Sequence, residues 1–218
     1  MKHRDWIITL GVVISIAAAT EGPGLRFQRA IIEQVRAYEA NGGSWPQLAD
    51  ACVVCHGRNG DSMNQQYADL AAQPAAYIAD QLHAFAEGRR LSPFMVPLAL
   101  SLTDAEIELL SEYFARQVVS NNVYQADALL RSRGEPLSES CIACHGSRFM
   151  GDKMNPRLAG QGYDYLLVQL DAYAANTRTD ATGAMNALAA TLSEDDRRAV
   201  SAYLASYPVT TRNVFDEQ

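Results

Sequence analysis

The stretch CVVCHG at residues 52–57 returns as CIACHG at residues 141–146, 89 positions further along the chain. The two stretches contain all four cysteines of the 218-residue sequence, namely Cys52, Cys55, Cys141 and Cys144. A histidine follows directly in each case, His56 in the first stretch and His145 in the second. Since a motif that recurs at a fixed spacing indicates an internal repeat, the sequence predicts two copies of one structural unit.

Further similarities appear at nearly the same spacing. LAAQ at residues 70–73 resembles LAGQ at residues 158–161, and LTD at residues 102–104 resembles LSE at residues 192–194. The polar stretch SNN at residues 120–122 separates the two copies. We therefore expect one domain over residues 20–120 and a second over residues 121–218, preceded by a distinct segment at residues 1–19.

The apolar pattern of both copies is helical. Residues 25–40 carry apolar side chains along one helix face, and we expect a shorter counterpart over residues 124–131. Two further stripes consist of Ile78, Leu82 and Phe85 in the first copy and of Leu166, Leu170 and Tyr173 in the second. Capping boxes, Thr103 with Glu106 and Ser193 with Asp196, predict two helix starts. No segment alternates as a strand would, so the predicted fold class is all-α.

The pattern Cys-x-x-Cys-His is typical of covalent attachment of c-type haem. The two thiols add to the two vinyl groups of one porphyrin, and the adjacent histidine lies beneath the iron as its proximal ligand. Three other uses of these cysteines are weaker. A thioredoxin-like redox pair needs a βαβ context, a zinc site needs its cysteine pairs closer together, and disulfides leave the two histidines unexplained.

A second axial ligand for each iron is expected from methionine. Met95 and Met185 lie 39 and 40 residues after their histidines, each ahead of a capped helix, at matching positions of the repeat. The alternative for a methionine is gap-filling in a core. The sequence has only four histidines: two belong to the motifs, and His3 lies in the N-terminal segment at residues 1–19. The one left over, His83, is expected on an exposed helix face because Asp171 takes its place in the second copy.

Composition excludes several classes of protein. Hydrophobic residues make up 48% of the chain and charged residues 20%, which describes a chain with a core and not a disordered one. The net charge of -7 argues against a nucleic-acid partner, because a nucleic-acid-binding protein needs a basic face.

The N-terminus has the character of an export segment. Lys2 and Arg4 precede an apolar run over residues 6–19, and the small residues 17–19 suit cleavage before Thr20. The alternative is an uncleaved membrane anchor through residues 6–19. Both alternatives predict that the rest of the chain lies outside the cytoplasm, in the periplasm.

From about residue 45 to residue 207 the chain resembles the dihaem cytochrome c4 family, in which a short linker joins two class I cytochrome c domains. The resemblance rests on both attachment motifs, on the two LAAQ-like segments, and on the methionines ahead of the capped helices. It implies two covalent haems c with thioether bonds to the four cysteines. It also implies the axial pairs His56 with Met95 and His145 with Met185.

One departure from the family concerns the proximal histidines. In such domains a proline carbonyl commonly accepts the Nδ1–H of this histidine; Pro156 fits that place in the second copy, whereas the first copy has Ala68. A main-chain carbonyl of alanine can still accept the bond, so we expect the loss of rigidity to tune the two haems differently.

Filled axial positions imply outer-sphere electron transfer and no catalytic residue. The resemblance implies a carrier of a bacterial respiratory chain, between a quinol-oxidising complex of the cytochrome bc1 type and a terminal oxidase such as the cbb3 type. The alternative is the dihaem subunit of a periplasmic dehydrogenase. A dihaem peroxidase or a ligand sensor requires an iron with an open sixth position. Arg89, Arg90 and Arg148 are expected on the surface, where they could serve in docking, or beside a haem propionate.

Overall fold

The computed structural model describes Arg29 and residues 46–120 and 124–209. The chain falls into two compact units, residues 1–44 and residues 45–218. Of the first unit only Arg29 is described, and it is helical. The predicted export segment and nearly all of the predicted helix over residues 25–40 therefore lie outside the described residues. Everything below concerns the second unit, whose residues 46–120 we call the first half and residues 124–209 the second half.

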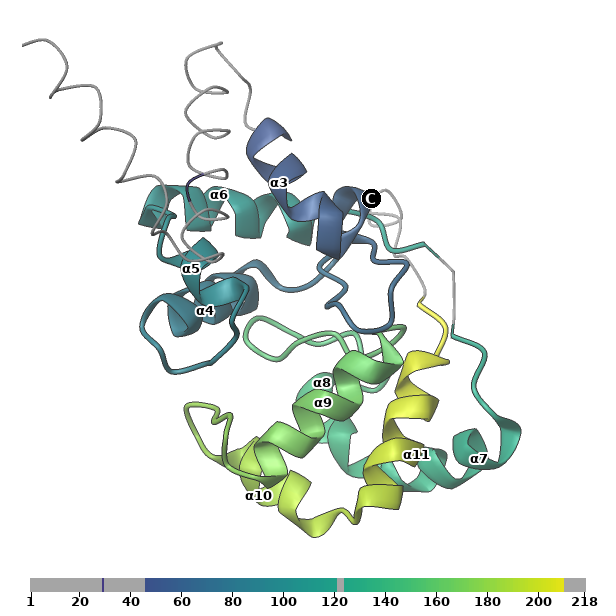
Figure 1. Ribbon diagram of the computed structural model, residues 1–218. Coiled ribbons are helices and arrows are strands. Elements are labelled where there is room, and N and C mark those ends of the chain that lie inside the picture. The colour runs from purple at the N-terminus through teal and green to yellow at the C-terminus, as the bar shows by residue number, and fades with distance from the viewer. Residues whose placement is uncertain (1–28, 30–45, 121–123, 210–218) are drawn as a thin grey trace, which may run out of the picture. The chain divides into compact units, whose positions relative to one another are not determined.

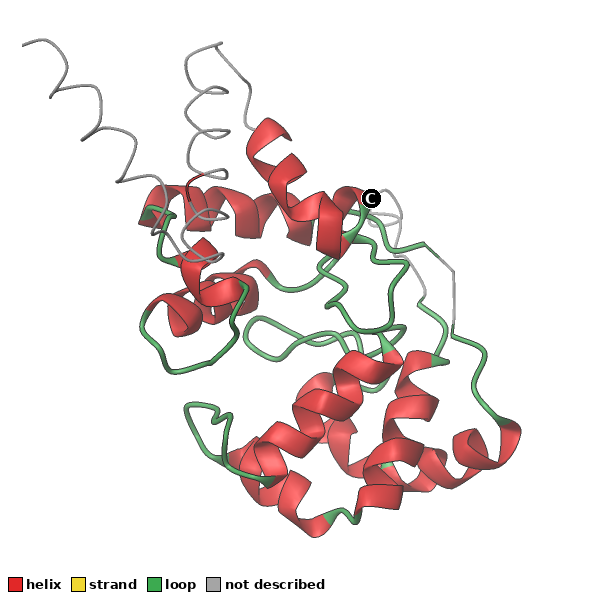
Figure 2. Cartoon of the chain, in the orientation of Figure 1, coloured by secondary structure: helices red, strands yellow, loops and turns green. Residues whose placement is uncertain are grey.

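The described residues are helices joined by loops, with no strand among them (Figure 2), as predicted. The first half contains α3 (Pro46–His56), η2 (Arg58–Gly60), α4 (Ala75–Ala86), α5 (Met95–Ala99) and α6 (Asp104–Ala115). The second half contains α7 (Ala128–Leu137), η3 (Glu139–Cys141), α8 (Ile142–His145), α9 (Tyr163–Ala174), α10 (Ala184–Thr191) and α11 (Glu194–Ala205) (Figure 1).

The two halves repeat one order of helices. After each Cys-x-x-Cys-His motif comes a long loop, then α4 or α9, then α5 or α10, then α6 or α11. The predicted stripes face inwards, since Ile78 and Phe85 of α4 are buried and Leu166, Leu170 and Tyr173 of α9 are buried in the same way. These apolar faces are what pack the helices of each half together.

Both predicted capping boxes are confirmed. At the start of α6 the Thr103 hydroxyl accepts from the Glu106 N–H, and the Glu106 carboxylate accepts from the Thr103 N–H. Ser193 and Asp196 make the same pair of bonds at the start of α11. Each box satisfies two backbone donors that the helix leaves unpaired, which fixes where these helices begin.

The predicted helix over residues 124–131 is wrong in its position. The helix α7 begins at Ala128, because the Asp127 carboxylate caps it by accepting from the N–H groups of Leu129 and Leu130. It then continues to Leu137, beyond the predicted end. Tyr124 lies in the preceding loop and stacks on Tyr163, with ring centroids 5.1 Å apart. The apolar pattern alone did not reveal the aspartate cap.

The two halves differ in how much protein core they have. A cluster of four buried residues occupies the first half, namely Ala49, Ile78, Leu110 and Phe114. A larger cluster of eleven buried residues is centred on the second half. Here α7 crosses α11 so closely that a Cβ added to Gly134 would lie 2.0 Å from the Ala199 carbonyl oxygen. Within the described ranges, no helix has the length and apolar character that crossing a bilayer requires.

Candidate functional site

Both motif histidines stand at the carboxyl end of a helix. His56 is the last residue of α3 and His145 the last residue of α8. The glycines that follow, Gly57 and Gly146, have φ angles of 74° and 78°, a backbone conformation that residues other than glycine rarely adopt. A Cβ on Gly57 would also lie 2.1 Å from the Asp61 carbonyl oxygen. The chain thus turns away directly after each histidine.

Each histidine ring is oriented by one backbone carbonyl. The Nδ1 atom of His56 lies 2.8 Å from the Ala68 carbonyl oxygen, and that of His145 lies 2.9 Å from the Pro156 carbonyl oxygen. A carbonyl can only accept, so Nδ1 carries the proton and Nε2 keeps its lone pair. Burial lowers the pKa of both histidines, which favours the neutral ring that a metal requires. The acceptors expected from the sequence are confirmed.

None of the four motif cysteines is in a disulfide bond. Cys55 and Cys144 are exposed, Cys52 is half-buried and Cys141 is buried. Burial raises the pKa of the Cys52 thiol to about 12 and raises that of Cys141 as well. A reactive redox pair needs a thiol of lowered pKa, so the surroundings of these cysteines do not suit thioredoxin-like exchange.

The two predicted axial methionines occupy equivalent places. Met95 begins α5 and Met185 is the second residue of α10, and both are half-buried. A side-chain oxygen binds the backbone N–H of each, from Ser92 at 3.1 Å and from Asp180 at 3.0 Å. Two other methionines, Met63 and Met154, are exposed surface residues. Met63 and Met154 do not occupy equivalent places in the two halves.

Each half therefore contains an imidazole that carries its proton on Nδ1, two cysteine side chains and a methionine thioether on a separate helix. This donor set fits haem c, which uses the two thiols for thioether bonds and the two remaining groups as axial ligands. It does not fit a structural zinc site. Among the residues that the structure describes, no three His, Cys, Asp or Glu side chains gather in the way that such a site requires.

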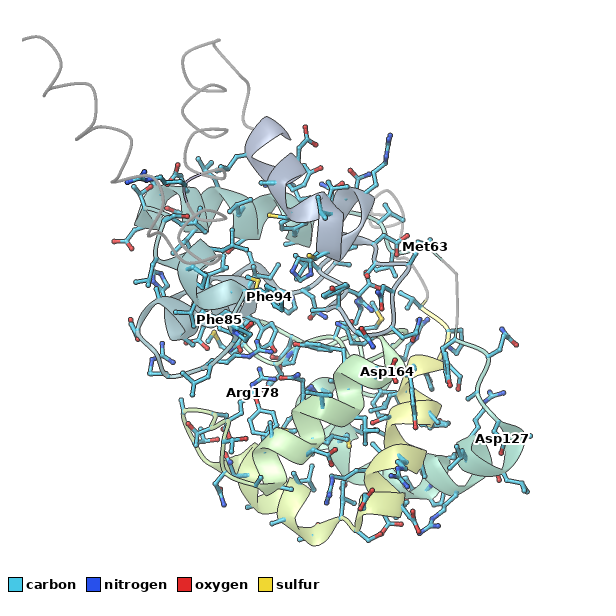
Figure 3. All side chains as sticks on the ribbon, in the orientation of Figure 1. Met63, Phe85, Phe94, Asp127, Asp164 and Arg178 are labelled. Atoms are coloured by element: carbon cyan, nitrogen blue, oxygen red, sulfur yellow. The ribbon has the colours of Figure 1, made fainter. Side chains whose placement is uncertain are left out.

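A polar network joins α4 to α9, which the sequence did not reveal. Arg90 donates to the side-chain oxygens of Gln81, Tyr165 and Gln169 at 2.8–3.0 Å. Its equivalent in the second half, Arg178, donates to Gln169, Tyr77 and Gln81 at 2.7–3.1 Å (Figure 3). Tyr77 and Gln81 recur in the sequence as Tyr165 and Gln169, but this repeat does not show that the four side chains meet across the two halves.

Three arginines and one histidine were expected on the surface, and they differ in how exposed they are. Arg90 is half-buried with its donors engaged, which corrects the expectation of a surface position. Arg89 pairs with Glu87 and Arg148 is exposed, as expected. His83 is half-buried on α4, with Nδ1 4.0 Å from the Asp104 carboxylate, so the expectation of an exposed residue is only partly met.

A buried ion pair between the halves was also missed. The guanidinium of Arg157 is fully buried and its Nη2 lies 3.9 Å from the Asp69 carboxylate. The same guanidinium donates to the backbone carbonyls of Ala71 and Ala159. Asp69 and Arg157 follow directly on Ala68 and Pro156, the acceptors of the two histidines. Equivalent positions of the repeat thus carry opposite charges.

Comparison with known proteins agrees with this geometry. The sequence profile of the cytochrome c family matches residues 132–208. The chain is 35% identical to a cytochrome c4 of Thiocapsa roseopersicina over 177 residues, which cover 73% of this chain and 91% of that protein. It is 31% identical over 183 residues to a thiosulfate dehydrogenase electron acceptor of Thiomonas intermedia, covering 77% of this chain and 84% of that protein.

The fold is also found in a solved structure. A crystal structure of reduced recombinant cytochrome c4 from Pseudomonas stutzeri aligns with a TM-score of 0.69 and 29% sequence identity. The alignment covers 73% of this chain and 94% of that chain. It extends beyond the residues matched by the family profile, so the similarity includes both halves.

Proposed function

Because the chain belongs to the cytochrome c4 family of dihaem electron carriers, we propose that it passes electrons from a quinol-oxidising complex of the cytochrome bc1 type to a terminal oxidase of a bacterial respiratory chain. The duplicated cysteine and histidine motif, with each histidine oriented through Nδ1 by a backbone carbonyl, is the observation that carries the proposal. Both irons would then have the same type of proximal ligand, a histidine whose ring is held in a fixed orientation.

We assign the protein groups as follows. Cys52 and Cys55 attach one haem and Cys141 and Cys144 the other. His56 and Met95 would bind the iron of the first haem, and His145 and Met185 would bind that of the second. When bound, haem supplies an iron that alternates between the ferrous and ferric states, and a methionine ligand raises its potential relative to a second histidine.

The protein keeps these ligands in place through its backbone. The Ala68 and Pro156 carbonyls fix the plane of each imidazole, and the side chains of Ser92 and Asp180 hold the backbone N–H groups of the two methionines. With a histidine and a methionine bound to each iron, no position would be left there for a substrate. The chain's own residues would then hold the iron in one place during electron transfer, and the less the ligands move, the faster the transfer would be.

The domain arrangement and location follow from the same assignment. We propose that residues 20–120 form one cytochrome domain and residues 121–218 the other, and that residues 1–19 direct the chain to the periplasm. Mass determination of the purified protein tests the last point, because cleavage before Thr20 removes a defined mass and a retained anchor does not.

Haem content and axial ligation are tested together. The purified chain should carry two haems that survive denaturation, with the weak long-wavelength ferric absorption of sulfur-bound iron. Met95→His and Met185→His should each remove about half of that absorption and lower one of the two potentials. Met154→His, at an exposed methionine, is the matched control and should change neither. A variant of Met95 or Met185 without effect would refute its assignment as a ligand.

A second candidate function is service to a periplasmic dehydrogenase. The similarity to a thiosulfate dehydrogenase electron acceptor favours this candidate. The two functions are separated by measuring how fast the oxidised protein is reduced by membranes with quinol and by a thiosulfate dehydrogenase with thiosulfate. A stable complex with the dehydrogenase, purified intact, would favour the second function, and reduction only by membranes would favour the first.

A further inference from the structure

The peptide group that orients each proximal histidine has a second hydrogen bond, and its partner comes from the other half. The Ala68–Asp69 peptide accepts from His56 through its oxygen at 2.8 Å and donates its N–H to Gln161 Oε1 at 2.6 Å. The Pro156–Arg157 peptide accepts from His145 at 2.9 Å and donates its N–H to Gln73 Oε1 at 2.9 Å.

Each glutamine is fixed by a return bond. Gln161 Nε2 donates to the Asp69 carbonyl at 3.0 Å, and Gln73 Nε2 donates to the Arg157 carbonyl at 2.9 Å. Further contacts are Gln73 Nε2 to the Asp69 carbonyl at 3.3 Å and the Gly162 N–H to Gln161 Oε1 at 3.0 Å. Both glutamines are buried, with exposed fractions of 3% and 4%. Since water does not compete with these bonds, the arrangement is rigid.

This chain of bonds acts on the histidine. A peptide whose N–H donates to a strong acceptor becomes polarised, and its oxygen becomes a stronger acceptor in turn. A stronger acceptor at Nδ1 makes the imidazole more basic, which is how partners beyond the first ligands tune a metal. A more basic imidazole stabilises the ferric iron and therefore lowers the reduction potential.

We propose that Gln161 is a positioning residue for the haem of the first half and Gln73 for that of the second, so that each half sets the potential of the other half's haem. This inference rests on the proposed roles of His56 and His145 as proximal ligands. It assigns a reason to the glutamine that ends both LAAQ-like segments, which neither helix packing nor haem attachment requires.

The experiment is a redox titration of the full-length holoprotein. Gln161→Met removes the acceptor but keeps an unbranched side chain of similar length. It should raise the potential of the His56 haem and leave that of the His145 haem unchanged, and Gln73→Met should do the reverse. To assign the waves, the titrations are repeated with Met185→His or Met95→His, which leaves a single methionine-ligated haem at the higher potential.

Two controls separate tuning from a general structural effect. Gln65→Met removes another glutamine whose Oε1 accepts a backbone N–H across the halves, from Tyr163 at 2.8 Å, without touching either histidine's peptide. It should leave the separation of the two potentials unchanged. Gln161→Glu keeps an acceptor for the Asp69 N–H and should not raise the potential of the His56 haem.

Nuclear magnetic resonance of the ferrous protein provides a readout that does not depend on the methionines. The Nδ1–H signal of His56 should move to lower frequency in Gln161→Met and stay in place in Gln73→Met. If Met95→His and Met185→His leave both potentials unchanged, the assignment of these methionines as ligands is wrong. The Nδ1–H signal of His56 still tests the role of the glutamines in that case. The inference would be overturned if a glutamine substitution shifted the potential of the haem in the glutamine's own half, shifted both potentials equally, or shifted neither.

Discussion

The carboxyl group of Asp69 should make the protein less stable as the pH rises from about 4 through about 6. Asp69 is 6% exposed. Its Oδ1 accepts from the Ser62 N–H at 3.0 Å, and Arg157 Nη2 lies 3.9 Å from its Oδ2. Burial raises its pKa from 3.8 to about 6, although Arg157 acts to lower it; the negative charge of Asp61 adds to the rise.

The sign follows from linkage. Because the folded state binds the proton more tightly than the unfolded chain, protonation of Asp69 stabilises the fold. This stabilisation is complete below about pH 4 and is lost as the pH rises through about 6. The full difference of roughly two pKa units corresponds to about 3 kcal/mol, of which about 1 kcal/mol falls between about pH 5 and pH 8.

Asp69→Asn isolates this contribution, since asparagine can still accept from Ser62 but does not ionise. The free energy of unfolding of both holoproteins is measured by guanidinium denaturation with circular dichroism at several pH values. The variant should gain about 1 kcal/mol on the wild type between about pH 5 and pH 8. If the wild type gains on the variant instead, then the attraction of Arg157 outweighs the cost of burial and the reasoning is refuted.

Three further changes test the packing, the haem and a helix cap. Gly134→Ala should lose about 1–3 kcal/mol of unfolding free energy despite the higher helix propensity of alanine, because its Cβ meets a carbonyl of α11; Ser132→Ala, on the exposed face of α7, should lose much less, and equal losses would contradict the close approach. Cys52→Ala combined with Cys55→Ala should give a protein with one covalent haem and reduced helical content, since the first half has a small core of its own; retention of two haems by mass would exclude the attachment site. Thr103→Ala should cost about 1 kcal/mol through loss of the capping box, measured by thermal unfolding, and no change would show that α6 does not need it.

Local sequence was sufficient for much of the fold. The capping boxes and the inward faces of α4 and α9 depend on residues a few positions apart, so a pattern reveals them. The start of α7 was misplaced because a single capping side chain, that of Asp127, overrode the apolar pattern. Local competition of this kind is where sequence reasoning about helix boundaries is weakest.

The haem sites, too, were predicted from local patterns in the sequence. The sequence predicted the four cysteines and both histidines from their spacing, because covalent attachment fixes the distance between the thiols and the imidazole. It predicted the two methionines from their matching positions in the repeat. The backbone acceptor of each histidine was also expected from its position, as Ala68 or Pro156.

What the sequence by itself determined is therefore the helical fold and the cofactor of each half, and it also predicted the residues that we propose as the ligands. Only the tertiary structure decided how the halves affect one another. The pairing of Asp69 with Arg157, and of each glutamine with the opposite histidine's peptide, joins residues more than 80 positions apart. No local pattern encodes such pairs, because the energy that selects them, the cost of burying a polar group without a partner, arises only when the two halves come into contact.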